Sequence, residues 1–187
     1  MNSLISKITW KTAVLFSAIF VAFYIVINQG DIGIAGLLKI TGGANILDFE
    51  FGYGSERAYE ILTALGTEGR AFYLTRLVPL DFPFPFSYML FFSGWIAFLS
   101  NRTAASKLSK LFLLMPVLAM LSDWTENIGV IAMLNNYPYL PVWAVCLAST
   151  AGIIKNITFI VNIGIIAILI GINIRYRIKN SQLAQLR

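Results

Sequence analysis

Four ionisable residues lie within long apolar stretches of this 187-residue chain: Asp81, Asp123, Glu126 and Lys155. A charged side chain in an apolar segment is costly, so these residues are the best candidates for chemistry. Asp123, Glu126 and Asn127 are spaced i, i+3 and i+4, which places them on one side of a helix. Carboxyl groups gathered in this way could share a proton or bind a cation.

Lys155, Thr158 and Asn162 follow a similar spacing and share one face of a second helix. The chain has no histidine, which excludes His-ligated haem, His-based zinc sites and Ser-His-Asp triads. Its single cysteine, Cys146, cannot form an internal disulfide. No phosphate-binding glycine loop or metal-ligand spacing is present in the sequence. We therefore expect no metal and no cofactor, and acid–base chemistry would have to use Asp123 or Glu126.

The composition places these residues in a membrane protein. Hydrophobic residues make up 58% of the chain and charged residues only 12%, and the mean hydropathy is +0.75. Soluble domains have about 45–50% apolar and about 25% charged residues. We therefore expect one integral membrane domain over residues 1–187. Basic residues mostly set topology in such a protein, so the net charge of +5 does not indicate a nucleic-acid partner.

Four segments are long and apolar enough to cross a bilayer, for which about 20 residues are needed. They cover about residues 12–28, 84–100, 111–134 and 150–174, and the last apolar stretch begins at Pro141. The sequence thus predicts an all-α integral membrane protein with a four-transmembrane-helix bundle. Gly164 and Gly171, seven residues apart, would allow a close helix contact in the fourth span.

Basic residues predict the orientation. They cluster before the first span, between the second and third, and after the fourth, at Lys7, Lys11, Arg102, Lys107, Lys110, Arg175, Arg177, Lys179 and Arg187. The positive-inside rule then places both termini in the cytoplasm of a multi-pass protein of the cytoplasmic (inner) membrane. Residues 30–80 become an extracytoplasmic cap between the first two spans.

The cap is predicted to be helical in its second half. Ser55 is a natural N-cap for a helix over 56–65, and Gly66 suits the residue after its end. Another helix is expected over 68–79, before the prolines within 81–85 break or kink the chain. Residues 30–54 show no clear pattern and could form an interfacial amphipathic piece. The short polar tail after Arg175 is expected to be a fraying helix end.

Distances along the helices place the polar residues at one depth. Asn28, Asp81, Glu126 and Lys155 each lie about 22–27 Å from the cytoplasmic end of their span at about 1.5 Å per residue. Asp123 is deeper, at about 18 Å. This layer is the outer half of a hydrocarbon core about 30 Å thick. It holds three acids and one clear cation, so unless Arg76 reaches down as a second cation, the excess acid must be protonated or pair with a bound cation.

These residues predict a polar, acid-rich pocket that binds a lipid-like or small amphipathic ligand. Its ligand-binding residues would be Asp81, Asp123, Glu126, Asn127 and Lys155, and the acid or base of any reaction would be Asp123 or Glu126. In a second interpretation, Glu126 and Lys155 only pair to hold the helices, and the chain is a structural subunit with a membrane-protein partner or a second copy. A proton path is disfavoured because residues 111–121 are nearly all apolar. Membrane lipids are expected partners in each case.

Three stretches of the sequence resemble a group of small, uncharacterised bacterial four-helix membrane proteins. They are LGTEGRAFYL (65–74), LDFPFPFSY (80–88) and DWTEN (123–127), and the resemblance covers roughly residues 47–160. It implies the four-helix fold but no reaction. The layout is also loosely similar to emopamil-binding and sterol-isomerase type domains, whose intramembrane acids hold a cationic or carbocation-like sterol species. No motif is shared with those domains, and the histidine of such isomerases is absent.

Overall fold

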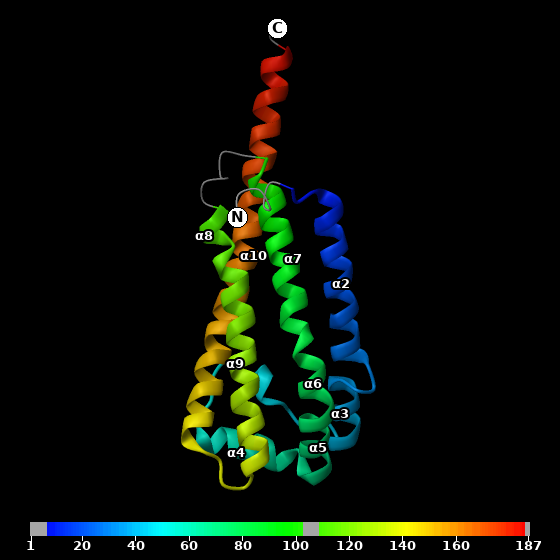
Figure 1. Cartoon of the computed structure of the whole chain (residues 1–187), viewed down its shortest axis with the longest axis vertical. Helices are drawn as coiled ribbons and strands as arrows, with labels where there is room; N and C mark the ends of the chain where they lie inside the picture. Colours follow the sequence, from blue (N-terminus) through cyan, green and yellow to red (C-terminus); the bar gives the residue numbers. More distant parts are fainter. Residues whose placement is uncertain (1–6, 103–108, 186–187) are drawn as a thin grey trace.

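The computed structural model describes residues 7–102 and 109–185, and these residues form helices and turns without a strand. Lys107 and Arg187, two of the basic residues used to predict the orientation, lie outside the described residues. The helices, labelled in Figure 1 where there is room, are α2 (Trp10–Gln29), α3 (Ile34–Thr41), the 3₁₀ turn η1 (Leu47–Phe49), α4 (Ser55–Ala64), α5 (Gly66–Phe72), the π-helical turn η2 (Tyr73–Leu77), α6 (Val78–Asp81), α7 (Pro83–Ser100), α8 (Ser109–Phe112), α9 (Leu114–Asn136) and α10 (Val142–Gln185).

Four helical segments are long and apolar enough to cross a membrane: Trp10–Thr41, Gly66–Ser100, Leu114–Asn136 and Val142–Lys179. Each contains most of one predicted span. The largest difference is in α10, which begins at Val142 and stays helical to Gln185 rather than fraying after Arg175. Residues 175–185 include Arg, Lys, Gln, Leu and Ala, which all favour helix formation.

The long helices do not contribute equally to the bundle. α7, α9 and α10 pack against one another, and the contact between α9 and α10 is the most extensive. α2 packs mainly on α7 and buries only Ala13 and Ile27 (Figure 1). The structure is therefore a three-helix core with a peripheral fourth helix.

Two glycines allow close contacts between the long helices. A Cβ at Gly129 on α9 would lie 2.7 Å from the carbonyl oxygen of Ala144 on α10, and a Cβ at Gly94 on α7 would lie 2.8 Å from Phe16 on α2. The contact predicted at Gly164 and Gly171 is wrong, because a Cβ at either position would meet no atom of the described residues within 4 Å.

Helices α3, α4 and α5 form a cap at one end of the bundle, opposite the described ends of the chain (Figure 1). The predicted N-cap at Ser55 is wrong: α4 starts at Ser55, and Gly54 precedes it without a side-chain cap. Gly66 has a φ of +64°, as expected for the residue after a helix end. At the prolines within 81–85, the backbone keeps a helical path from α6 into α7, because Phe82 has helical angles. Pro83 is the first residue of α7, a position where no N–H donor is needed, so the predicted break affects only the backbone hydrogen bonds.

Residues 42–54 form a segment that the sequence left unassigned (cyan in Figure 1). It leaves α3 through Gly42, which has a φ of +66°, and contains η1. At its far end the amide of Tyr53 donates to Ser149 Oγ on α10 at 2.8 Å. Near its middle, Glu50 accepts from Arg57 Nη2 on α4 at 2.7 Å. The segment is thus fastened both to α10 and to the cap, and it brings Asp48 to the polar cluster.

Candidate functional site

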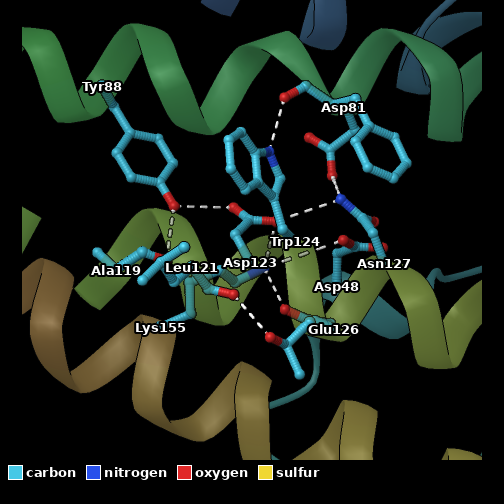
Figure 2. Close-up of polar contacts among 12 residues, drawn as sticks. Asp48, Asp81, Tyr88, Ala119, Leu121, Asp123, Trp124, Glu126, Asn127 and Lys155 are labelled. Atoms are coloured by element: carbon cyan, nitrogen blue, oxygen red, sulfur yellow. Dashed lines mark hydrogen bonds and ion pairs between the residues drawn. The ribbon is translucent and has the colours of Figure 1, made fainter. Parts of the chain in front are cut away.

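Lys155 is the centre of a buried charged cluster. Its Nζ lies 2.6 Å from Glu126 Oε2, 3.9 Å from Asp48 Oδ1 and 4.0 Å from Asp123 Oδ1 (Figure 2). The side chain of Glu126 has no exposure, and that of Lys155 has 13%. The predicted pairing of these two residues is therefore present. The ammonium group of Lys155 also faces two further carboxyl groups.

A second series of polar contacts connects α6 and α7 to α9. The Nδ2 amide of Asn127 donates to Asp81 Oδ2 at 2.8 Å and lies 3.5 Å from Asp123 Oδ1. The hydroxyl of Tyr88 on α7 lies 3.0 Å from Asp123 Oδ2 and 3.0 Å from the carbonyl oxygen of Ala119 (Figure 2). The side chains in this series of polar contacts are all buried, namely those of Asp81, Tyr88, Asp123 and Asn127. Asp123 joins it to the Lys155 cluster.

The structure brings all five predicted ligand-binding residues together, but only four of them line one cavity. This cavity has a volume of about 190 Å³, and its lining includes Asp81, Asp123, Asn127 and Lys155. Glu126 lies behind Lys155, where a Cβ at Gly152 would come within 2.7 Å of its Oε1 atom. The reason is the helix period: Glu126 is turned about 100° from Asn127, so it faces α10 rather than the cavity.

The rest of the cavity wall is mostly apolar. Its residues come from α2, α3, the 42–54 segment and the Gly66–Ser100 helical segment, and they are Tyr24, Ile27, Asn28, Ile34, Ile46, Phe49, Tyr73, Leu77, Val78 and Phe84, together with Asp48. Asn28, Asp81 and Lys155, which the sequence places in one layer, line the same cavity. Tyr24 and Phe49 are 48% and 59% exposed, so the cavity opens to the outside between α2 and the 42–54 segment.

Several polar residues at this site were not found from the sequence. Asp48 accepts a hydrogen bond from the buried hydroxyl of Tyr73, and neither residue stood out by its spacing. Tyr88 could have been noticed as a hydroxyl within an apolar helix that needs a buried partner. Arg76, considered as a second cation, is exposed and makes no ion pair with any residue in the described ranges.

Tyr53 lies outside the four apolar helical segments, and the charged groups of the Lys155 cluster affect its pKa. Burial raises the pKa of its phenol, and the nearby carboxyl groups of Glu126 and Asp48 raise it further. The hydroxyl is enclosed and has no hydrogen-bond partner among the described residues. Tyr53 is therefore a neutral phenol at neutral pH.

The cluster has more acids than bases. Asp48, Asp123 and Glu126 lie within 4.0 Å of the ammonium group of Lys155, and Asp81 is a further acid on the cavity wall. Within residues 7–102 and 109–185, no three acidic or cysteine side chains come together in a group that could hold a metal ion. The excess acid must therefore be protonated or balanced by a cation of another kind.

Comparisons of the chain with protein-family models, curated proteins and solved structures found no match.

Proposed function

We propose that the chain is a multi-pass protein of the cytoplasmic membrane, with both termini in the cytoplasm and the α3–α5 cap outside. The four long apolar helices support the membrane location. Basic residues occur at the ends of α2, α7 and α10 that lie opposite the cap, including Lys11, Arg102 and Arg175. Residues 30–80 hold only four of the fourteen basic residues, so the bias of basic residues favours this orientation.

Cysteine labelling in intact cells tests the orientation. Cys146 is first replaced by serine, and Tyr139→Cys is added in the turn between α9 and α10, where Tyr139 is 87% exposed. A membrane-impermeant maleimide is expected to label this cysteine in intact cells, because the turn is at the cap end. Arg177→Cys, at the other end of α10, is the matched control and should react only after permeabilisation. The reverse pattern would show that the cap is cytoplasmic.

We further propose that the cavity binds the polar head and the first part of the chain of a lipid-like amphiphile. The observation that carries this proposal is the make-up of its wall, in which five polar residues of the cluster meet a mostly apolar remainder. The five are Asp48, Asp81, Asp123, Asn127 and Lys155. The exposed residues at its mouth, Tyr24 and Phe49, would face the bilayer rather than water, so a ligand could enter sideways from the membrane.

The size of the cavity fits this class of ligand. An engineered apolar cavity of about 150 Å³ holds one benzene molecule. A cavity of about 190 Å³ therefore suits a head group and a few methylene groups, while the rest of a long chain would leave past Tyr24 and Phe49. Polar groups at one end of an apolar pocket are the usual means of orienting a small molecule.

Filling the cavity is the direct test. Ile34→Trp adds bulk at a half-buried position of the wall and should displace the ligand without deleting a polar group. Ile32→Trp is the control, because Ile32 is 49% exposed and is not among the lining residues. Native mass spectrometry of gently purified protein should find a copurified amphiphile on the wild type and on Ile32→Trp, and much less on Ile34→Trp. Equal ligand content in all three proteins would contradict the proposal.

Acid–base catalysis is a second candidate, and one observation favours Asp123 for it. Asp123 lines the cavity and its Oδ2 lies 3.0 Å from the Tyr88 hydroxyl, so a ligand would meet a carboxyl group joined to a second proton carrier. Glu126, the other sequence candidate, does not reach the cavity wall. If a copurified ligand is chemically changed by wild type but not by Asp123→Asn, the chain is an enzyme.

A further inference from the structure

Lys155, the cation of the cluster, is already surrounded by carboxyl groups. Lys155 Nζ pairs with Glu126 at 2.6 Å, and two more carboxyl groups, those of Asp48 and Asp123, lie within 4.0 Å of it. A single ammonium group therefore serves three carboxyl groups. It has no capacity left for a fourth acid on the cavity wall.

Asp81 is that fourth acid. It is 9% exposed and lines the cavity, and its one hydrogen-bond partner in the described part of the chain is the neutral amide of Asn127. No described lysine or arginine lies within ion-pair distance of it. Figure 2 shows one carboxyl oxygen of Asp81 directed to Asn127 and the other without a partner. A buried carboxyl group with a free oxygen on a cavity wall is a natural binding point for a cation.

Aromatic rings lie in the same wall. Tyr24, Phe49 and Phe84 belong to three different elements, and all of them line the cavity with Asp81. Ring faces attract organic cations, and recognition of ammonium groups by carboxylates and aromatic rings is a common use of this effect. The described residues include no group of three or more acidic or cysteine side chains placed to hold a metal ion.

We infer that the head group of the amphiphile is an organic cation of the ammonium type, held by Asp81 and the aromatic wall. This inference rests on the proposed function, because it names the ligand class of the same cavity. The bound ammonium group would balance the acid that Lys155 leaves uncompensated. The apolar chain of the ligand would follow the wall formed by Ile34, Leu77 and Val78.

The test compares two probes that differ only in charge. The first is radiolabelled dodecyltrimethylammonium, whose charge is permanent, and the second is its neutral carbon isostere, with tert-butyl in place of trimethylammonium. Binding to the full chain in dodecyl maltoside micelles is measured by equilibrium dialysis against empty micelles. Asp81→Asn should weaken binding of the cation about ten-fold or more and leave the neutral probe unchanged, because a charge-assisted contact is lost.

A matched variant controls for net charge. Asp31→Asn removes one negative charge from an exposed acid outside the cavity lining, and we expect cation binding within about two-fold of wild type. Tyr24→Leu gives a second reading at the mouth of the cavity. It should weaken the cation several-fold and the neutral isostere much less, because the chain of each probe passes this ring but only the cation is attracted to its face. This arm remains informative if Asp81→Asn does not fold.

The outcomes separate this inference from the proposal beneath it. If Ile34→Trp blocks both probes but Asp81→Asn and Tyr24→Leu leave the cation as tightly bound as wild type does, the pocket stands and the cationic head group is wrong. If Ile34→Trp changes the binding of neither probe, the amphiphile pocket itself is wrong. Selective loss of the cation in Asp81→Asn, with Asp31→Asn unaffected, supports both.

Discussion

Lys155→Met is expected to lower the free energy of unfolding by about 3–5 kcal/mol, the range seen when one partner of a buried ion pair is removed. The substitution leaves Glu126, Asp48 and Asp123 facing one another without an ammonium group. Methionine keeps much of the length and apolar character of the lysine stem, so the loss should reflect charge rather than packing. Reversible unfolding in mixed detergent micelles, followed by circular dichroism, gives the measurement.

The loss of stability should differ between the two partners of the ion pair, Lys155 and Glu126. Glu126→Gln should cost less than Lys155→Met, because Lys155 keeps Asp48 at 3.9 Å and Asp123 at 4.0 Å. The double variant should be milder than Lys155→Met alone, since the most buried carboxylate is removed together with its cation. Strictly additive losses would show that the 2.6 Å contact between these two residues carries no coupling energy.

Gly129→Ala is expected to destabilise the protein by about 1–3 kcal/mol, as overpacking of a tight contact does. The new methyl group would lie 2.7 Å from the Ala144 carbonyl oxygen, 2.7 Å from Ala148 Cβ and 3.1 Å from the Ala148 amide nitrogen. Two of these atoms belong to the backbone of α10, so no side-chain rotation relieves the contact. The helices must separate, and the α9–α10 interface, the largest in the bundle, must loosen.

Gly164→Ala is the matched control for this prediction. Gly164 lies within α10, and a Cβ there would meet nothing within 4 Å. We therefore expect no loss of stability, and a gain of up to about 1 kcal/mol from the higher helix propensity of alanine. The same unfolding assay measures both variants. Equal effects at Gly129 and Gly164 would mean that the close crossing of α9 and α10 does not matter for stability.

Much of the fold could be predicted because it depends on local properties of the chain. The length of the apolar stretches located all four long helices. The predicted end of the second span at residue 100 is the end of α7, and the predicted start of the first span at residue 12 is about two residues from the start of α2 at Trp10. Helix rise was sufficient to predict that Asn28, Asp81 and Lys155 come together, and they line one cavity. A rise of fixed length per residue needs no knowledge of the neighbouring helices.

The sequence also determined which charged residues lie within apolar helices and are therefore costly, namely Asp81, Asp123, Glu126 and Lys155. It could not determine which way each one faces, because that depends on the rotation of α9 between α7 and α10. Only the tertiary structure shows that Asp123 and Asn127 line the cavity while Glu126 faces Gly152. Helical spacing places residues relative to one another but not relative to a partner helix.

Asp48 is the clearest case of what only the tertiary structure decided. It lies in a segment without helical or strand periodicity, and it reaches Lys155 because the chain turns at Gly42 and is fastened to Ser149. Contacts between residues more than a hundred positions apart leave no local pattern in a single sequence. The sequence by itself therefore determined the membrane helices and most of the charged residues at the site. The cavity, the carboxyl group that Asp48 adds to it and the unpaired oxygen of Asp81 depend on long-range packing.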